Sequence, residues 1–210
     1  MFKNILFIII AMILGSSSIA ANNKFKVRGD TLFYSTEEQF ISEKGIKYED
    51  ISMFRKLLSE NPMVNKIELF SYGGSITAGL EISKIVRDFD VTTIVAKECS
   101  SSCISIFLAG KNRDLKLGGL LGFHRPHWKL EGLKSYYELY AEGEGWNDPF
   151  QFASWLEKDT LYYVADLIDN YLIAGVDYRL ATKSLKVPHD QIWYPTRKEL
   201  IAYGVLREKR

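Results

Sequence analysis

Residues 66–75 read Lys-Ile-Glu-Leu-Phe-Ser-Tyr-Gly-Gly-Ser, and this stretch sets the fold class. Its first half predicts a short strand, which runs directly into the glycine pair Gly73-Gly74. Apolar residues then recur at helical spacing over 76–89, and the β-branched run 91–96 predicts a second strand. The order strand, glycine loop, helix, strand is typical of a βαβ unit, in which the two strands lie parallel in one sheet.

A second unit of the same kind follows. A helix predicted from about Ser101 to Ala109 is apolar nearly all round, and a strand predicted over 119–123 delivers His124 at its end. Parallel strands with nearly continuous apolar residues imply an α/β architecture whose sheet is buried on both faces. In such folds, ligand chemistry collects at the carboxyl ends of the strands.

The sequence before these units predicts a hairpin and a helix. Residues 24–28 and 31–35 alternate around Gly29-Asp30, a residue pair that favours a tight turn. Apolar residues at helical spacing predict a helix over 48–60.

The sequence after the second unit is different in kind. Residues 127–178 are rich in aromatic side chains and predict two or three helices, broken around 143–149. A short helix is predicted over 196–205, with Gly204 at its end in the position of a helix C-cap.

The N-terminus has the features of a secretory signal peptide. Residues 1–21 contain one early lysine, an apolar run too short to span a bilayer, and small residues at the expected cleavage point. An uncleaved N-terminal anchor is the alternative. Cleavage leaves residues 22–210 as one α/β domain of about 190 residues in the periplasm or secreted, with no later segment apolar enough to span a membrane.

The charge balance excludes one class of partner. The chain has 27 basic and 26 acidic residues, and cleavage removes Lys3, which leaves the mature chain neutral. There is therefore no electrostatic case for binding nucleic acid.

The only two cysteines are Cys99 and Cys103. In an oxidising compartment they are candidates for a disulfide, because a four-residue spacing at a helix start brings their Cα atoms to roughly 6 Å. The alternative is two buried free thiols that fill space beside the helix.

Three short segments carry residues suited to acyl transfer. The backbone of Gly73 and Gly74 can approach a ligand closely and aim N–H groups at a developing negative charge. Ser101 at a helix start would benefit from the positive end of the helix dipole and from the unpaired Ser102 N–H. His124 could act as general base near neutral pH. Taken singly, each signal is weak, since glycine pairs form turns and serines cap helices.

Two other chemistries compete for the same residues. His124, His127 and His189 could ligate a metal, but no acidic cluster accompanies them, so no metal is expected. A thiolate of Cys99 or Cys103 could be the nucleophile, but oxidation in an exported protein would remove its reactivity.

The order and spacing of the three segments resemble a known family. Residues 71–80 read Ser-Tyr-Gly-Gly-Ser-Ile-Thr-Ala-Gly-Leu, 99–110 read Cys-Ser-Ser-Ser-Cys-Ile-Ser-Ile-Phe-Leu-Ala-Gly, and 122–126 read Gly-Phe-His-Arg-Pro. This pattern is similar to the Clp protease proteolytic subunit and its exported relatives in the ClpP/crotonase superfamily, over about 32–126 and 193–206. The resemblance implies an α/β spiral of ββα units with an aromatic-rich helical segment in the C-terminal half.

The resemblance also implies roles for individual residues. Ser101 would be the nucleophile and His124 the base. The oxyanion hole would be formed by the glycine pair, through Gly73 and Gly74, together with the Ser102 N–H. Each role falls on a residue that the sequence had already marked as a candidate.

Two positions depart from the family pattern. The proline usual before the glycine pair is Tyr72 here, and the position of the triad acid falls on Ile192, which cannot orient a histidine. Asp190, two residues earlier, could substitute if its loop bulges. The alternative is that Asp190 is an ordinary loop aspartate.

The leading hypothesis is an exported ClpP-like serine hydrolase that acts without a cofactor on a peptide or protein substrate and forms a homo-oligomer. A second hypothesis is a non-catalytic exported module that keeps the fold and uses its aromatic face for binding or assembly. A crotonase-like acyl-CoA enzyme is a third hypothesis, disfavoured because that cofactor belongs to the cytoplasm.

Overall fold

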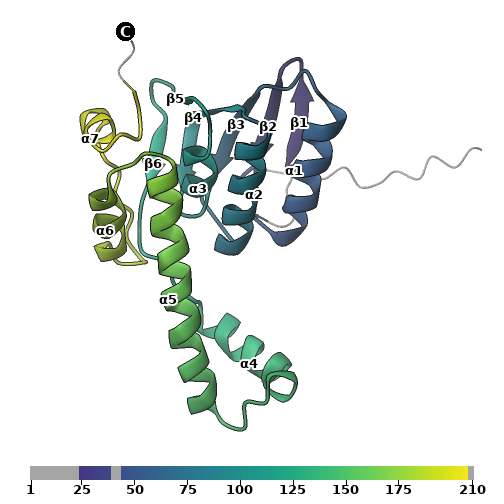
Figure 1. Cartoon of the computed structure of the whole chain (residues 1–210), viewed down its shortest axis with the longest axis vertical. Helices are drawn as coiled ribbons and strands as arrows, with labels where there is room; N and C mark the ends of the chain where they lie inside the picture. Colours follow the sequence, from purple (N-terminus) through teal and green to yellow (C-terminus); the bar gives the residue numbers. More distant parts are fainter. Residues whose placement is uncertain (1–23, 39–43, 208–210) are drawn as a thin grey trace, which may run out of the picture.

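The computed structural model describes residues 24–38 and 44–207, and these are built around a six-stranded sheet (Figure 1). The strands are β1 (Phe25–Arg28), β2 (Thr31–Ser35), β3 (Lys66–Ser71), β4 (Thr92–Ser100), β5 (Arg113–Leu115) and β6 (Leu120–Gly122). Their order is β1-β2-β3-β4-β5, and β6 pairs with β4. The β1–β2 hairpin is antiparallel and the other pairings are parallel. The predicted signal segment 1–21 lies outside the described residues.

Seven helices accompany the sheet in this part of the chain. They are α1 (Tyr48–Glu60), α2 (Ile76–Asp88), α3 (Cys103–Leu108), α4 (Leu130–Glu144), α5 (Pro149–Ile173), α6 (Tyr178–Lys186) and α7 (Arg197–Ala202). Helices α1, α2 and α3 lie side by side over one face of the sheet (Figure 1). Helix α5 extends far beyond the sheet, with α4 beside its outer end.

The core lies between the sheet and these three helices. In β2 and β3 the buried residues alternate with half-buried ones, so that Leu32, Tyr34, Ile67 and Leu69 face the core. The prediction of a sheet buried on both faces is therefore wrong for these two strands. They are covered by helices on one face only, which gives the period-2 pattern of a half-buried strand.

Several element boundaries differ from the prediction. β4 continues to Ser100 because residues 98–100 pair with β6, whereas the β-branched run ends at 96. β5 was not predicted, since Arg-Asp-Leu is too short and polar to give a strand signal. α6 was also missed, although Asp177 accepts a hydrogen bond from the Arg179 N–H in the manner of an N-cap.

The aromatic-rich helical segment is present and is broken where the sequence predicted. α4 ends at Gly145, which has a left-handed φ of 72°, and α5 begins after Asp148, whose carboxylate accepts the N–H groups of Phe150 and Gln151. Between the two helices, ring centroids 4.9 to 6.3 Å apart join four residues that we name the aromatic cluster: Tyr136, Trp146, Phe152 and Trp155.

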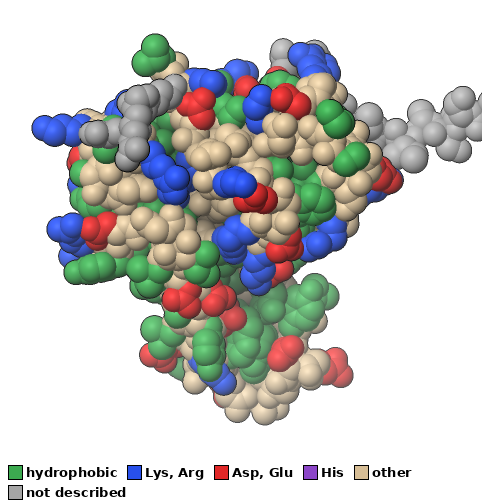
Figure 2. Space-filling view, turned by 45° about the horizontal axis from the view of Figure 1, so that its top comes forward, with side chains coloured by type: hydrophobic (Ala, Val, Ile, Leu, Met, Phe, Trp, Pro, Cys, Tyr) green, Lys and Arg blue, Asp and Glu red, His purple; other side chains and the backbone are tan. Residues whose placement is uncertain are grey.

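Hydrophobic side chains also gather on the outside of this projection, in the lower part of Figure 2. Leu139, Phe150, Leu161 and Tyr162 are between 66% and 85% exposed. Among the described residues, no helix is both long enough and apolar enough to cross a membrane.

Candidate active site

Ser101 lies in the turn between β4 and α3 with its backbone in the left-handed region, at a φ of 57°. The predicted helix start at Ser101 is wrong, because α3 begins at Cys103 and Ser102 is its N-cap. The Ser101 N–H donates to the Gly122 carbonyl at 3.0 Å, which extends the pairing of β4 with β6. A non-glycine residue in this conformation costs on the order of 1 to 3 kcal/mol, and such strain is concentrated at functional sites.

A disulfide brackets this strained turn. Cys99, in the last part of β4, is bonded to Cys103, the first residue of α3, with their Cα atoms 5.3 Å apart. Both cysteines are fully buried. The covalent link closes the short loop that holds Ser101 and so restrains its backbone.

Reduction of the disulfide is expected to lower the free energy of unfolding by about 2 kcal/mol, because the bond closes a short loop between cysteines with a sequence separation of 4. The measurement is urea denaturation with and without dithiothreitol. A Cys99→Ala/Cys103→Ala double variant is the control, since its unfolding curve should be the same with and without dithiothreitol. Coincident curves for the oxidised and the reduced wild-type protein would contradict the prediction.

The glycine pair packs directly against this turn. Gly73 has a φ of 108°, and a Cβ atom on it would lie 2.6 Å from the Ser101 Cβ. Gly74 has a φ of 150° and forms a bridge with Ile46, whose N–H donates to the Gly73 carbonyl and whose carbonyl accepts the Ser75 N–H. Only glycine fits either position without strain.

The three predicted oxyanion-hole residues differ in what their N–H groups do. The Gly73 N–H donates to the Ser71 hydroxyl at 3.1 Å. The N–H groups of Gly74 and Ser102 have no hydrogen-bond partner among the described residues. The Ser102 N–H directly follows Ser101 in the chain, and the Gly74 N–H directly follows Gly73, which packs on Ser101. Unpaired backbone donors of this kind can stabilise a negatively charged oxygen.

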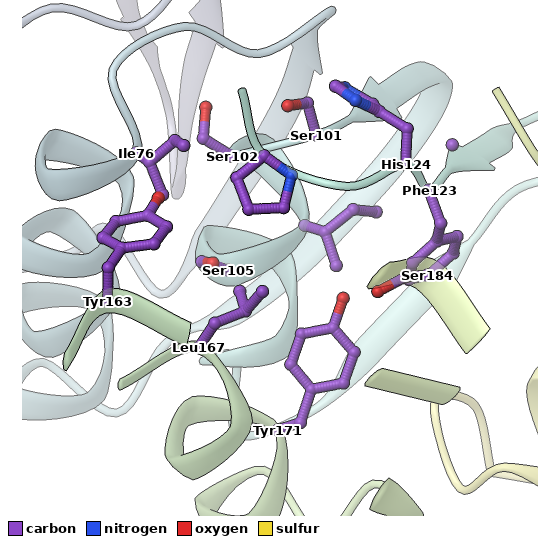
Figure 3. A pocket seen from close by; sticks show the side chains of 13 residues that line it. Ile76, Ser101, Ser102, Ser105, Phe123, His124, Tyr163, Leu167, Tyr171 and Ser184 are labelled. Carbon is purple, nitrogen blue, oxygen red and sulfur yellow. The ribbon is translucent and has the colours of Figure 1, made fainter. Parts of the chain in front are cut away.

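His124 lies beside Ser101 at the edge of the same pocket (Figure 3). Within the described residues, neither ring nitrogen of His124 is hydrogen-bonded to the Ser101 hydroxyl. The His124 Nδ1 lies 2.9 Å from the Arg125 carbonyl oxygen. Because a carbonyl oxygen can only accept, we assign the proton of the neutral ring to Nδ1, which leaves Nε2 free to accept a proton.

The structure does not bring Asp190 to His124. Phe123 pairs with Trp193, and the Arg125 N–H donates to the Val187 carbonyl, so that residues 188–192 bulge out of this pairing. Asp190 is exposed in that bulge, and no hydrogen bond within the described residues joins it to His124. The position implied for the acid holds Ile192, which packs over Gly122.

The three histidines do lie together. The ring centroids of His124 and His127 are 6.2 Å apart, and the rings of His127 and His189 stack at 4.3 Å. The pKa of His127 is lowered, first by burial and then by these two neighbouring rings. No group of three or more His, Cys, Asp or Glu residues in the described chain is arranged to hold a metal ion.

A carboxylate that the sequence did not mark, that of Glu98, lies three residues before Ser101 on β4. Glu98 accepts hydrogen bonds from the Ser100 hydroxyl at 2.6 Å and from the Tyr194 hydroxyl at 2.7 Å. Burial and the bond to Glu98 raise the pKa of Tyr194 to about 12. This network fixes Ser100, the residue before Ser101, and no local pattern could reveal it because Glu98 and Tyr194 are 96 residues apart.

The sequence matches no family model, and no curated protein matches it either. Its structure is similar to the solved structure of a point mutant of ClpP1 from Listeria monocytogenes, with a TM-score of 0.54. That similarity covers 86% of this chain and 90% of that one, at 18% sequence identity. The fold is ClpP-like, as predicted, and at this identity the likeness concerns the fold alone.

Proposed function

We propose that this protein is an exported ClpP-like serine hydrolase that cleaves peptides or proteins. One observation carries the proposal: a strained serine, Ser101, packs against Gly73 and lies beside His124, and the next residues along the chain, Ser102 and Gly74, have N–H groups that are unpaired within the described residues. A nucleophile, a base and oxyanion donors in one place are the minimum set for acyl transfer.

The proposed reaction has two halves. The Ser101 Oγ attacks the scissile carbonyl while His124 Nε2 takes its proton, and the Gly74 and Ser102 N–H groups hold the oxyanion. When the intermediate collapses, the C–N bond breaks and His124 returns the proton to the leaving amine. Water then attacks the acyl-enzyme by the same route and releases the acid and free Ser101.

The Arg125 carbonyl takes over one task of the missing acid. It orients the ring and keeps the proton on Nδ1, so that Nε2 is free to accept the proton of the nucleophile. A carbonyl is neutral, so it stabilises the developing imidazolium less than a carboxylate would. We therefore expect slow turnover compared with a complete Ser-His-Asp triad.

A fluorophosphonate probe tests the proposal on the purified mature protein. The wild type should be labelled, whereas Ser101→Ala and His124→Ala should lose at least about 100-fold of the labelling rate because they lack the nucleophile or its base. Ser52→Ala, an exposed serine on α1, is the control and should label like the wild type. The proposal would be rejected if Ser101→Ala were labelled as fast as the wild type. It would also be rejected if the wild type were not labelled in an assay in which a known serine hydrolase, the positive control, is labelled.

The second candidate function is a non-catalytic binding or assembly module with this fold. Two observations favour it: no carboxylate bonds to His124, and no hydrogen bond joins Ser101 to His124 within the described residues. This module would fold normally and assemble but leave the probe unreacted.

Assembly is proposed under both functions. The exposed apolar side chains on α4 and α5 form the kind of surface that soluble proteins bury against a partner, and we expect a homo-oligomer that forms through it. The periplasmic or secreted location is likewise proposed, from the signal-like segment 1–21 and the disulfide.

A further inference from the structure

We propose that the pocket beside Ser101 selects a substrate residue with a neutral, hydrogen-bonding side chain, above all glutamine or asparagine, and that the hydroxyls of Tyr163 and Ser102 read it. The side chain concerned belongs to the residue whose carbonyl Ser101 attacks. This specificity rests on the proposed function, which it supplies with a substrate class.

The pocket opens next to the two candidate catalytic side chains (Figure 3). Its walls come from α3, from α5 and α6, from the first residue of α2, and from the strand end that carries His124. Apolar side chains such as Ile76, Ile104 and Leu167 supply much of the lining. A substrate bound with its carbonyl at Ser101 would place the adjacent side chain in this pocket.

Two hydroxyl groups of the lining are buried and have no hydrogen-bond partner within the described residues: those of Ser102 and Tyr163. The nearby Ser184 hydroxyl, by contrast, donates to the Ala181 carbonyl at 2.8 Å. Burial also raises the pKa of Tyr163, so its phenol is neutral at physiological pH and can both donate and accept. A buried hydroxyl left unpaired costs about 1 to 3 kcal/mol, and a ligand that pairs with it recovers that energy.

The rest of the lining excludes charged side chains. None of the described residues that line the pocket is Asp, Glu, Lys or Arg. A charged substrate side chain would therefore lose its hydration without gaining a counter-ion, which is strongly unfavourable.

An apolar side chain would fill the space but leave both hydroxyls unpaired. A carboxamide has an acceptor oxygen and a donor nitrogen, and each hydroxyl can serve as either partner. A site that hydrogen-bonds its substrate in this way strongly disfavours an analogue of the same size without the polar group. Glutamine and methionine form such a pair, since they are similar in length and volume.

The test compares peptides that end in glutamine with peptides that end in methionine. Their affinity is measured by isothermal titration calorimetry on the Ser101→Ala protein, which needs no turnover. We expect the glutamine peptide to bind at least about 10-fold more tightly, since one satisfied buried hydroxyl accounts for roughly that factor. Wild-type kcat/KM for the corresponding fluorogenic substrates should show the same preference.

Tyr163→Phe, made in the Ser101→Ala background for the titrations, should lower the preference by about 10-fold, because it removes one of the two hydroxyls and each is worth roughly that factor. Ser102→Ala, which keeps the backbone N–H, should also lower the preference for glutamine. It serves as a second test in case Tyr163→Phe does not fold. Tyr162→Phe is the matched control, since its ring is 67% exposed on the same helix and does not line this pocket. That control should keep the full preference.

The outcomes separate this inference from the proposed function. If the glutamine peptide binds more tightly but the probe does not label the wild type, the proposed hydrolase is rejected and the pocket assignment stands. Probe labelling with equal affinity for both peptides, tighter binding of methionine, or no binding of either would overturn the pocket assignment alone. An unchanged preference in both Tyr163→Phe and Ser102→Ala would overturn it as well.

Discussion

Gly74→Ala is expected to lower the free energy of unfolding by about 4 kcal/mol and to abolish labelling by the fluorophosphonate probe. A Cβ atom at this position would lie 2.3 Å from the Ile46 nitrogen and 2.5 Å from the Ile46 oxygen. Both are backbone atoms of the bridge that holds the glycine loop, so neither can move aside as a flexible side chain would. The φ of 150° adds strain that any residue other than glycine would suffer.

The loss of labelling has a separate cause from the loss of stability. Pushing Gly74 away from Ile46 changes the direction of its N–H group, the proposed oxyanion donor. Labelling should therefore be absent even at temperatures where circular dichroism shows the variant to be folded. Gly132→Ala is the control: this glycine lies in α4 with no atom within 4 Å of its would-be Cβ, and the change should be neutral or slightly stabilising. Wild-type stability in Gly74→Ala would contradict the structure of this loop.

Asp50→Ala is the second substitution with a large expected effect, a loss of about 3 to 5 kcal/mol in the free energy of unfolding. The Asp50 carboxylate is 1% exposed. It accepts hydrogen bonds from the Lys24 ammonium at 3.0 Å and from the Tyr34 hydroxyl at 2.7 Å, and it also accepts the Lys47 N–H at the start of α1. Its removal takes a buried carboxylate away from an ammonium group, a buried phenol and a backbone N–H at the start of α1.

Urea denaturation measures this effect, with Asp30→Ala as the matched control. Asp30 also pairs with a lysine, Lys66, at 2.8 Å, but its side chain is 45% exposed. An exposed pair contributes at most about 1 kcal/mol, so the control should lose little stability. Similar losses in the two variants would show that burial of the Asp50 pair adds nothing.

The Asp50 pair also bears on the candidate site. Lys24 donates to the Gly45 carbonyl at 2.8 Å, and a Cβ on Gly45 would lie 3.1 Å from the Gly73 carbonyl oxygen. The next residue, Ile46, forms the bridge to Gly74. Through these contacts the pair supports the outer side of the glycine loop.

Sequence patterns predicted the framework of this molecule because the framework depends on local periodicity. The hairpin, the helix that became α1, the βαβ unit around Gly73-Gly74 and the break before α5 each follow from spacing, turn residues or caps within a few positions. The structure also brings Gly73 against Ser101, since both follow strands whose carboxyl ends lie at one edge of a parallel sheet.

Features that depend on distant contacts could not be predicted in this way. The left-handed backbone of Ser101 results from pairing with Gly122 and from the packing of Gly73, and the local sequence Ser-Ser-Ser contains no sign of it. The covering of β2 and β3 on one face only depends on where α1 and α2 pack. The sequence indicated the absence of an acid at Ile192, but not that the Arg125 carbonyl meets His124 Nδ1, since a backbone group carries no residue signature.

Helix α5 joins the aromatic cluster to the wall of the pocket in one continuous helix. Phe152, in the aromatic cluster, and Tyr163, in the pocket wall, belong to the same helix and are separated by about 16 Å along its axis. An α-helix without a proline or glycine in its interior is a stiff rod, and α5 has its only proline at its first residue. In the proposed homo-oligomer, a partner subunit that binds the outer end of α5 would therefore also act on the position of Tyr163 in the pocket wall, which would couple the proposed assembly to the proposed substrate preference.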